Sequence, residues 1–210
     1  MCGIAGIFGG GEPDEFIELA SRMISTIAHR GPEGTRVEAV TGAPGALAHA
    51  RLAIIDIAGG EQPMPFADGR YTVVLNGEIY NYIELRKELA AKGVNFRTKS
   101  DTETLLAAYD QWGASCLERI VGMFAFAIWD RVSRSLFAAR DRFGKKPFVY
   151  SWQHGRFAFA SEAKALAALP DFERRIEPQA LELYLALGYV PAPHTIWRGM
   201  NKLPAGHSLT

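Results

Sequence analysis

The second residue of the chain is a cysteine, and its position gives it chemistry that few cysteines have. In the opening run MCGIAGIFGG, removal of Met1 would leave Cys2 with a free α-amino group beside its thiol. Such an amine ordinarily has a pKa of about 7.7–8.0, so near neutral pH it can accept the thiol proton. Cys2 is therefore a candidate nucleophile that carries its own base. The alternative is a small buried residue of the first strand, a common place for cysteine.

Two charged residues could hold the ends of a small substrate. Arg51 begins the apolar run RLAIID, where a guanidinium could bind a carboxylate through two hydrogen bonds. The alternative for Arg51 is a surface salt bridge, for instance with Asp56. Asp101 follows Ser100 and could receive an ammonium group, or it could simply favour the amino-terminal end of a helix.

Asn76 and Gly77 follow a β-branched run and offer two hydrogen-bond donors, an amide side chain and a main-chain N–H. Such a pair can stabilise a developing oxyanion, where loss of one donor typically costs about 3–4 kcal/mol. The alternative is an Asn-Gly hairpin turn. A helix-like segment, not a returning strand, comes next in the sequence, and this weakens the alternative.

Hydrophobic periodicity predicts the elements that must position these residues. Helical spacing covers 14–28, 82–91, 161–169 and 178–187, and Ser100 with Glu103 forms a capping-box pattern that opens a further helix ending near Trp112. Strands are expected at 3–8, 36–40, 47–55, 71–75, 123–129, 135–139, 148–152 and 157–160. Because the strands outnumber the helices and come in pairs, the pattern predicts an antiparallel α+β domain.

The texture of the chain changes after Gly188, where YVPAPHTIWRGMNKLPAGHSLT is rich in Pro and Gly. We therefore expect one domain over 1–188 and, over 189–210, a linker that begins the connection to a further domain. The chain has no internal repeat.

Composition argues against several classes of function. Lys plus Arg and Asp plus Glu each number 23, so no net charge attracts nucleic acid or an anionic membrane. Two cysteines form no disulfide framework, and the five histidines lack metal-ligand spacing. With no signal-peptide core and no membrane-length apolar run, we expect a cytoplasmic protein without a nucleic-acid or membrane partner.

An ordered set of motifs then indicates a family. MCGIAGIF, HRGPE, ARLAIID, NGEIYN, SDTE, GMFAFAIWD, RDRFGKKP, FASEAKAL and LPAGH follow one another along the whole chain. The set closely resembles the amino-terminal glutaminase domain of glutamine-dependent asparagine synthetases, which are class II glutamine amidotransferases of the N-terminal-nucleophile hydrolase superfamily. Glu33 and Lys145 depart from the family pattern, which usually has aspartate and an aliphatic residue there.

The resemblance implies an αββα sandwich, in which two antiparallel sheets are stacked face to face, with helices outside. It implies that Cys2 attacks the side-chain amide of L-glutamine and forms a thioester. It also implies roles for eight further residues: an oxyanion hole from Asn76 and Gly77, substrate carboxylate and ammonium binding by Arg51 and Asp101, and a pocket lined by Leu52, Ile54, Ile55 and Glu78.

An asparagine synthetase of this type continues into an ATP-using domain with a sequence like SGGxDS, which does not occur in this chain. From the resemblance we expect no cofactor and no metal in this domain, and ATP and Mg²⁺ only in a carboxy-terminal synthetase domain. Ammonia would pass to that domain. A homodimer is left open, as is the final acceptor of the ammonia.

Two other functions stay open at this point. An amide hydrolase of the bile-salt or penicillin type would use the same nucleophile on a different substrate. A non-catalytic domain would result if Met1 were retained, because the Cys2 nitrogen would then lie in a peptide bond. Outside the site we expect core positions for Cys116, Trp112, Trp129 and Trp152, and structural roles for His29 and His49. For RDRFGKK we expect either a solvated loop or a surface that packs against the further domain.

Overall fold

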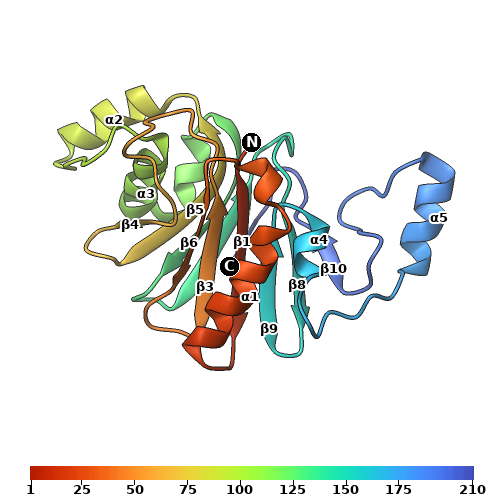
Figure 1. Cartoon of the computed structure of the whole chain (residues 1–210). Helices are drawn as coiled ribbons and strands as arrows, with labels where there is room; N and C mark the ends of the chain where they lie inside the picture. The colour runs from red at the N-terminus through yellow and green to blue at the C-terminus, as the bar shows by residue number, and fades with distance from the viewer.

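The computed structural model describes residues 1–210 and contains two antiparallel β-sheets packed face to face (Figure 1). The six-stranded sheet has the order β10-β8-β9-β1-β3-β2, with strands Met200–Lys202, Val149–Gln153, Arg156–Ala160, Gly3–Gly9, Gly45–Ala50 and Thr35–Ala39. The five-stranded sheet has the order β11-β7-β6-β5-β4, with strands Ser208–Leu209, Ser135–Arg140, Gly122–Asp130, Tyr71–Ile79 and Met64–Phe66.

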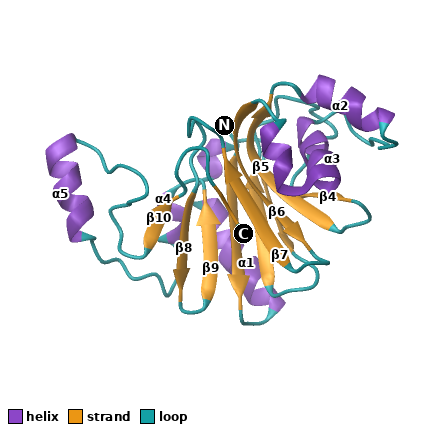
Figure 2. Ribbon diagram, turned by 180° about the vertical axis from the view of Figure 1, so that it is seen from behind, coloured by secondary structure: helices purple, strands orange, loops and turns teal.

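Helices cover the outer face of each sheet, as the view from behind also shows (Figure 2). The six-stranded sheet is covered by α1 (Pro13–Ser25) and α4 (Ala163–Leu166), and the five-stranded sheet by α2 (Tyr82–Ala91) and α3 (Asp101–Trp112). Short 3-10 helices follow at Ala28–Arg30 and Gly113–Glu118. The predicted αββα sandwich is therefore confirmed.

Three hydrophobic clusters correspond to the three contacts between these four layers. One cluster joins α1 and α4 to the six-stranded sheet, and a second joins α2 and α3 to the five-stranded sheet. The third lies between the sheets and includes Ile4, Val74 and Phe159. Burial of these apolar side chains, at about 25 cal/mol per Å², provides the main driving force for this arrangement.

Alternation along the strands decides which residues face the gap between the sheets. In β1, Ala5 and Ile7 face α1, so Ile4 and, by the two-residue period, Cys2 face the other sheet. In β5, Val73 and Leu75 face the helices, whereas Val74 faces the first sheet. Asn76 shares the face of Val74, so the sandwich directs Cys2 and Asn76 toward one another.

The structure corrects several predicted element boundaries. The strand predicted over 47–55 ends at Ala50, and residues 51–60 instead form a loop. The strand predicted over 71–75 continues to Ile79, so Asn76 and Gly77 lie within β5 and pair with β6, not in a hairpin turn. Of the tryptophans expected in the core, Trp129 is buried and Trp112 partly so, but Trp152 is 71% exposed because it lines an open groove at the far end of the sandwich.

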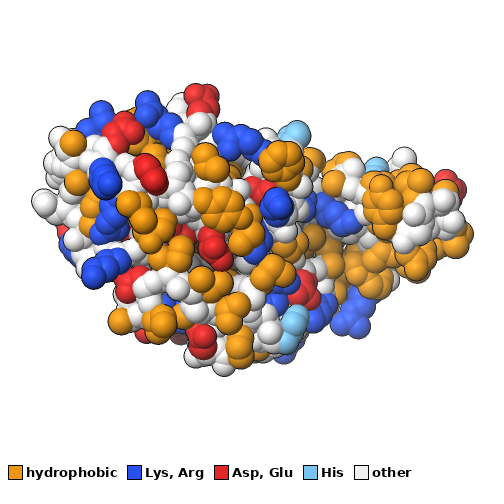
Figure 3. All heavy atoms as spheres, turned by 90° about the horizontal axis from the view of Figure 1, so that it is seen from above, with side chains coloured by type: hydrophobic (Ala, Val, Ile, Leu, Met, Phe, Trp, Pro, Cys, Tyr) orange, Lys and Arg blue, Asp and Glu red, His pale blue; other side chains and the backbone are white.

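The carboxy-terminal segment begins with an arm that leaves the body of the sandwich. Helix α5 (Pro178–Leu187) stands apart from the sheets in both ribbon views and presents a largely hydrophobic surface (Figure 3). Its exposed apolar side chains are Leu181, Tyr184, Leu185 and Leu187. Beyond it, within the predicted linker 189–210, β10 pairs with β8 and β11 pairs with β7. That this segment also leads to a further domain stays a prediction.

Candidate active site

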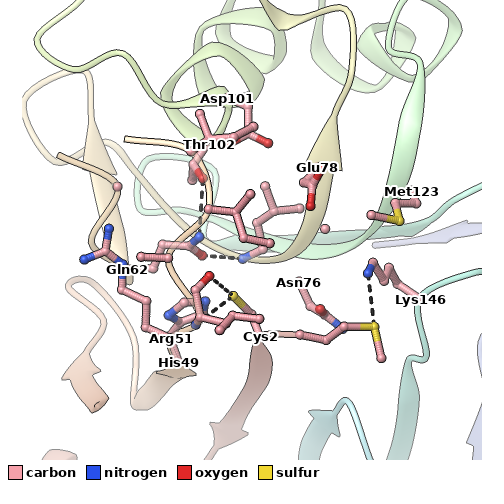
Figure 4. A pocket seen from close by; sticks show the side chains of 18 residues that line it. Cys2, His49, Arg51, Gln62, Asn76, Glu78, Asp101, Thr102, Met123 and Lys146 are labelled. Carbon is pink, nitrogen blue, oxygen red and sulfur yellow. Dashed lines mark hydrogen bonds between the residues drawn. The ribbon is translucent and has the colours of Figure 1, made fainter. Parts of the chain in front are cut away.

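One cavity at the amino-terminal end of β1 collects every residue that the sequence proposed for the site (Figure 4). Cys2 lies there with Asn76 and Gly77 from β5, with Asp101 from the start of α3, and with Arg51 from the loop after β3. The same cavity is lined by Leu52, Ile54, Ile55 and Glu78. Residues up to 99 positions apart in the sequence are thus brought to one end of the gap between the sheets.

The Cys2 sulfur is held by the main chain of Leu52. The thiol donates to the Leu52 carbonyl oxygen, and the Leu52 N–H donates to Sγ, both at 3.4 Å. Burial raises the pKa of the Cys2 thiol, while the Leu52 N–H and the positive charges of the amino terminus, Lys146 and Arg51 act in the opposite direction. The site therefore contains groups that favour a thiolate in an otherwise desolvated position.

Arg30, in the HRGPE motif, fixes the main chain of the same cysteine. Its Nε donates to the Cys2 carbonyl oxygen at 2.9 Å, and its Nη1 forms a 2.8 Å ion pair with Glu162, in the FASEAKAL motif. The next residue, Gly31, has no room for a side chain, because a Cβ atom there would lie 2.1 Å from the Ala50 carbonyl carbon. Two motifs far apart in the sequence thus hold the first residues of β1.

The loop at 51–60 is shaped by its own polar groups. Arg51 Nη2 donates to the carbonyl oxygens of Asp56 (3.1 Å) and Ile57 (2.7 Å), which leaves Nε and Nη1 without a protein acceptor. The Asp56 carboxylate instead accepts from the N–H groups of Gly59 (3.0 Å) and Lys99 (2.7 Å), and these bonds lower its pKa. The alternative of an Arg51–Asp56 ion pair is therefore wrong.

Asn76 is fully buried, yet its Nδ2 and Oδ1 atoms have no hydrogen-bond partner in the protein. Leaving a buried amide unpaired typically costs about 1–3 kcal/mol, so such a group calls for an explanation. A bound substrate oxygen would supply one. Gly77 is required by close packing, because a Cβ atom there would lie 2.2 Å from the Met123 carbonyl oxygen on β6.

Asp101 does more than open a helix. Ser100 caps α3 by accepting from the Thr102 N–H at 3.0 Å, while the Asp101 carboxylate accepts from the Ile79 N–H at 2.9 Å. Burial raises the pKa of Asp101, and the nearby charge of Glu78 raises it further. Two carboxyl groups on one side of the cavity form a surface that suits an ammonium group.

Several lining residues were not singled out as site residues from the sequence. Gln62 is anchored by the Leu75 N–H at 2.6 Å and by Thr102 Oγ1 at 3.3 Å. His49, expected to be structural, lines the cavity, and burial lowers its pKa to about 4, so it is neutral. Lys146, expected at the surface, is buried in the cavity wall. Only the spatial arrangement identifies these three residues.

The departures from the family pattern have a simple structural context. Glu33 accepts from the Ala53 N–H at 2.5 Å and so supports the loop that carries Arg51, whereas Lys145 faces solvent.

Cys116 lies in the core beneath α3, as expected, and burial raises its pKa to about 12. No group of three or more His, Cys, Asp or Glu side chains could hold a metal ion, and no helix is long and apolar enough to span a bilayer.

Comparison with curated proteins places this geometry in a family context. The chain is 41% identical to "Asparagine synthetase [glutamine-hydrolyzing] 3" of Bacillus subtilis over 215 residues, which cover 100% of this chain and 34% of the relative. It is 43% identical to "Putative asparagine synthetase [glutamine-hydrolyzing]" of Mycobacterium bovis, covering 98% of this chain and 34% of the relative. The chain thus spans about a third of the length of these relatives.

Solved structures support the fold. The glutamine phosphoribosylpyrophosphate amidotransferase of B. subtilis superimposes with a TM-score of 0.68 at 24% identity, over 84% of this chain and 46% of that chain. The family described as "Glutamine amidotransferase domain" matches residues 1–210. With that match over its full length, and with relatives at more than 40% identity, the chain belongs to the glutamine amidotransferase domain family and is related to the glutaminase domain of asparagine synthetases.

Proposed function

We propose that this domain hydrolyses L-glutamine to glutamate and ammonia, with Cys2 as the nucleophile. One observation carries the proposal: the Cys2 sulfur shares a cavity with a buried, unpartnered Asn76 amide and with opposite charges at Arg51 and Asp101. L-Glutamine carries an amide, a carboxylate and an ammonium group on one short frame, and so offers a complement to each of these groups.

Met1 must be removed first, because the Cys2 nitrogen otherwise lies in a peptide bond and has no basic lone pair. The Met1 residue is 58% exposed, which gives an aminopeptidase access to it. After removal, the free α-amine accepts the thiol proton while Sγ forms a bond to the amide carbon of glutamine.

Asn76 Nδ2 and the Gly77 N–H stabilise the negative oxygen of the tetrahedral intermediate. Collapse breaks the carbon–nitrogen bond, and the α-ammonium returns the proton to the leaving nitrogen, which departs as ammonia. Water then attacks the γ-glutamyl thioester with the amine as base, and this step releases glutamate and the Cys2 thiol.

Arg51 and Asp101 position the substrate in this scheme. The Arg51 Nε and Nη1 groups, free of protein acceptors, bind the α-carboxylate, and Asp101 with Glu78 binds the α-ammonium. Leu52, Ile54 and Ile55 line the space between. Binding of the α-carboxylate and the α-ammonium holds the side-chain amide carbon near the sulfur, and this positioning accelerates the attack.

We further propose that the ammonia is consumed by a synthetase domain of the kind named in the relatives, which are about three times as long as this chain. ATP and Mg²⁺ would act in that domain, and this domain would need no cofactor. Aspartate is the acceptor that the names of the relatives suggest.

The test is glutamate release from glutamine by the chain after intact mass has established that Met1 is absent. A Cys2→Ala variant, and a chain whose amino terminus is blocked, should both lose this activity entirely. Turnover in either variant would overturn the mechanism. Competition between glutamine and simple acyl amides separates this function from that of an amide hydrolase with another substrate, because only an amino acid engages both Arg51 and Asp101.

A further inference from the structure

Lys146 is a buried cation that the mechanism above leaves unused. Its side chain lines the Cys2 cavity and points into it beside Asn76 (Figure 4), and the residue is only 5% exposed. Its ammonium forms no ion pair: its one hydrogen-bond contact is with Met1 Sδ at 3.2 Å, and a thioether is a weak acceptor. Burying a lysine in this way is costly, because charged groups lose hydration that such a contact does not replace.

The main chain of Lys146 is held on both sides, so the side chain enters the cavity from a fixed position. Its N–H donates to Asp141 Oδ2 at 3.0 Å, and its carbonyl oxygen accepts from Arg140 Nε at 2.7 Å. Asp141 also accepts from the N–H groups of Phe124, Phe143 and Lys145, which ties the turn to β6. This turn sends Lys145 to solvent and Lys146 into the site.

The contact with Met1 places the ammonium next to the position that excision empties. Met1 is bonded directly to the Cys2 nitrogen, so its removal frees the α-amine and takes away the only partner of Lys146. A positive charge then faces the new amine and the sulfur across a desolvated space. In such a space a like charge disfavours the ammonium form of the amine, and an opposite charge favours a thiolate.

We propose that Lys146 is a positioning residue for the Cys2 reaction, whose ammonium keeps the liberated α-amine unprotonated and favours negative charge on the attacking sulfur. This inference rests on the proposed glutamine hydrolysis. It identifies Lys146 as the residue that lets an amino-terminal cysteine act as nucleophile and base at neutral pH, although burial of the Cys2 sulfur works against formation of the thiolate.

Other charged groups around Cys2 set the background against which Lys146 acts. Arg51 lines the cavity from the loop after β3, and its charge also favours the thiolate. Glu78 on β5 and Asp101 on α3 bring carboxyl groups to the same cavity, and neutral His49 contributes no charge. Arg30 is paired with Glu162, so its charge is largely balanced. The charge of Lys146 lowers the pKa of the Cys2 thiol more than the charge of Arg51 does.

The test compares Lys146→Met with Lys146→Arg and Lys145→Met, all with Met1 removed as judged by intact mass. The first variant loses the charge at similar volume, the second keeps the charge, and the third removes the neighbouring solvent-facing lysine. For each protein, kcat/KM for glutamine and the rate of Cys2 alkylation by iodoacetamide are followed from pH 5.5 to 9. Cys116 is fully buried, and peptide mass mapping separates its signal from that of Cys2.

We expect the acid limb of both profiles to move up by about one pH unit in Lys146→Met, which corresponds to about a tenfold loss of kcat/KM at pH 6.5. KM should change little, Lys146→Arg should retain most of the activity, and Lys145→Met should match the wild type. Superimposable profiles for Lys146→Met and wild type, or a rise in KM with an unmoved profile, would overturn the inference. If Lys146→Met unfolds, Lys146→Gln takes its place with the same expectation.

The two proposals fail in different ways. If the wild type with Met1 removed does not release glutamate from glutamine, the proposed function is wrong, whatever the variants do. The alkylation profile measures the effect of Lys146 on Cys2 without any turnover, so it decides the inference independently.

Discussion

Arg30 Nε donates a 2.9 Å hydrogen bond to the carbonyl oxygen of Cys2, while Arg30 Nη1 pairs with Glu162 at 2.8 Å. The nucleophile is therefore held by an arginine whose own position depends on a residue 132 positions further along the chain. This link explains why HRGPE and FASEAKAL occur together: one motif supplies the arginine, and the other supplies the carboxylate that orients it.

Replacing Arg30 by glutamine should weaken both the fold and the reaction. Hydrogen bonds that involve a charged group typically contribute about 1.5–3 kcal/mol, so we expect the free energy of unfolding to fall by about 2 kcal/mol. A displaced Cys2 should also lower kcat by about tenfold or more. Urea denaturation and glutamate release measure the two effects. The control is Arg36→Gln, which removes exposed pairs with Glu38 and Glu61 and should cost less than about 1 kcal/mol; equal losses in the two variants would contradict the role of Arg30.

Asn76→Ala should separate activity from stability. The variant removes a proposed oxyanion donor, so kcat should fall about 10²–10³-fold. It also removes two buried polar atoms that have no partner, so the free energy of unfolding should stay within about 1 kcal/mol of the wild type. The comparison is Gln62→Ala in the same cavity, whose amide accepts from the Leu75 N–H and which should be destabilised by about 1–3 kcal/mol. Wild-type kcat in Asn76→Ala would exclude the oxyanion role.

Gly77→Ala should destabilise the five-stranded sheet through a steric clash. The added Cβ would lie 2.2 Å from the Met123 carbonyl oxygen, a main-chain atom that can move only if β5 and β6 separate. Overpacking of this kind typically costs about 1–3 kcal/mol, which denaturant unfolding will detect. Gly10→Ala is the matched control, since no atom lies within 4 Å of the Cβ position there. If both alanine variants unfold at the same denaturant midpoint, the close approach of β6 does not explain this glycine.

Local sequence patterns predicted most of the fold because they are set by neighbouring residues. The helices at Tyr82–Ala91 and Pro178–Leu187 have the predicted bounds, since their starts and ends are marked by local signals such as Gly188. The extension of β5 through Asn76 and Gly77 was missed because an Asn-Gly pair usually marks a turn. Pairing with β6 overrides that preference here, and no local signal reports it.

The site residues depended on a different kind of information. Cys2 stood out by its position in the chain, and the resemblance connected it with Arg51, Asn76 and Asp101, which the structure brings into one cavity. Lys146 could not be distinguished from Lys145 by residue type. The two lysines differ in the turn that Asp141 and Arg140 stabilise. The Asp141 carboxylate accepts from the N–H groups of Phe124 on β6 and of Lys146, and Arg140 donates to the Lys146 carbonyl oxygen. Local sequence patterns do not report these contacts.

Asp101→Asn should show a stability change with a defined pH dependence. Burial raises the pKa of Asp101 in the folded chain, so the folded state binds this proton more tightly than the unfolded state. Above the raised pKa the wild type therefore carries a desolvated charge that reduces its stability, and this penalty disappears as the pH falls below the ordinary pKa of an aspartate. We expect Asp101→Asn to be more stable than the wild type at pH 7.5, and the difference between the two to shrink toward pH 4. Parallel urea titrations at several pH values measure that difference, and a stability difference that grows on acidification would contradict the prediction.

The same variant keeps an oxygen for the Ile79 N–H but loses the negative charge, so KM for glutamine should rise about tenfold or more while the fold is retained. A higher stability together with a higher KM would indicate that the buried carboxylate is kept for the substrate ammonium at a cost to the stability of the domain.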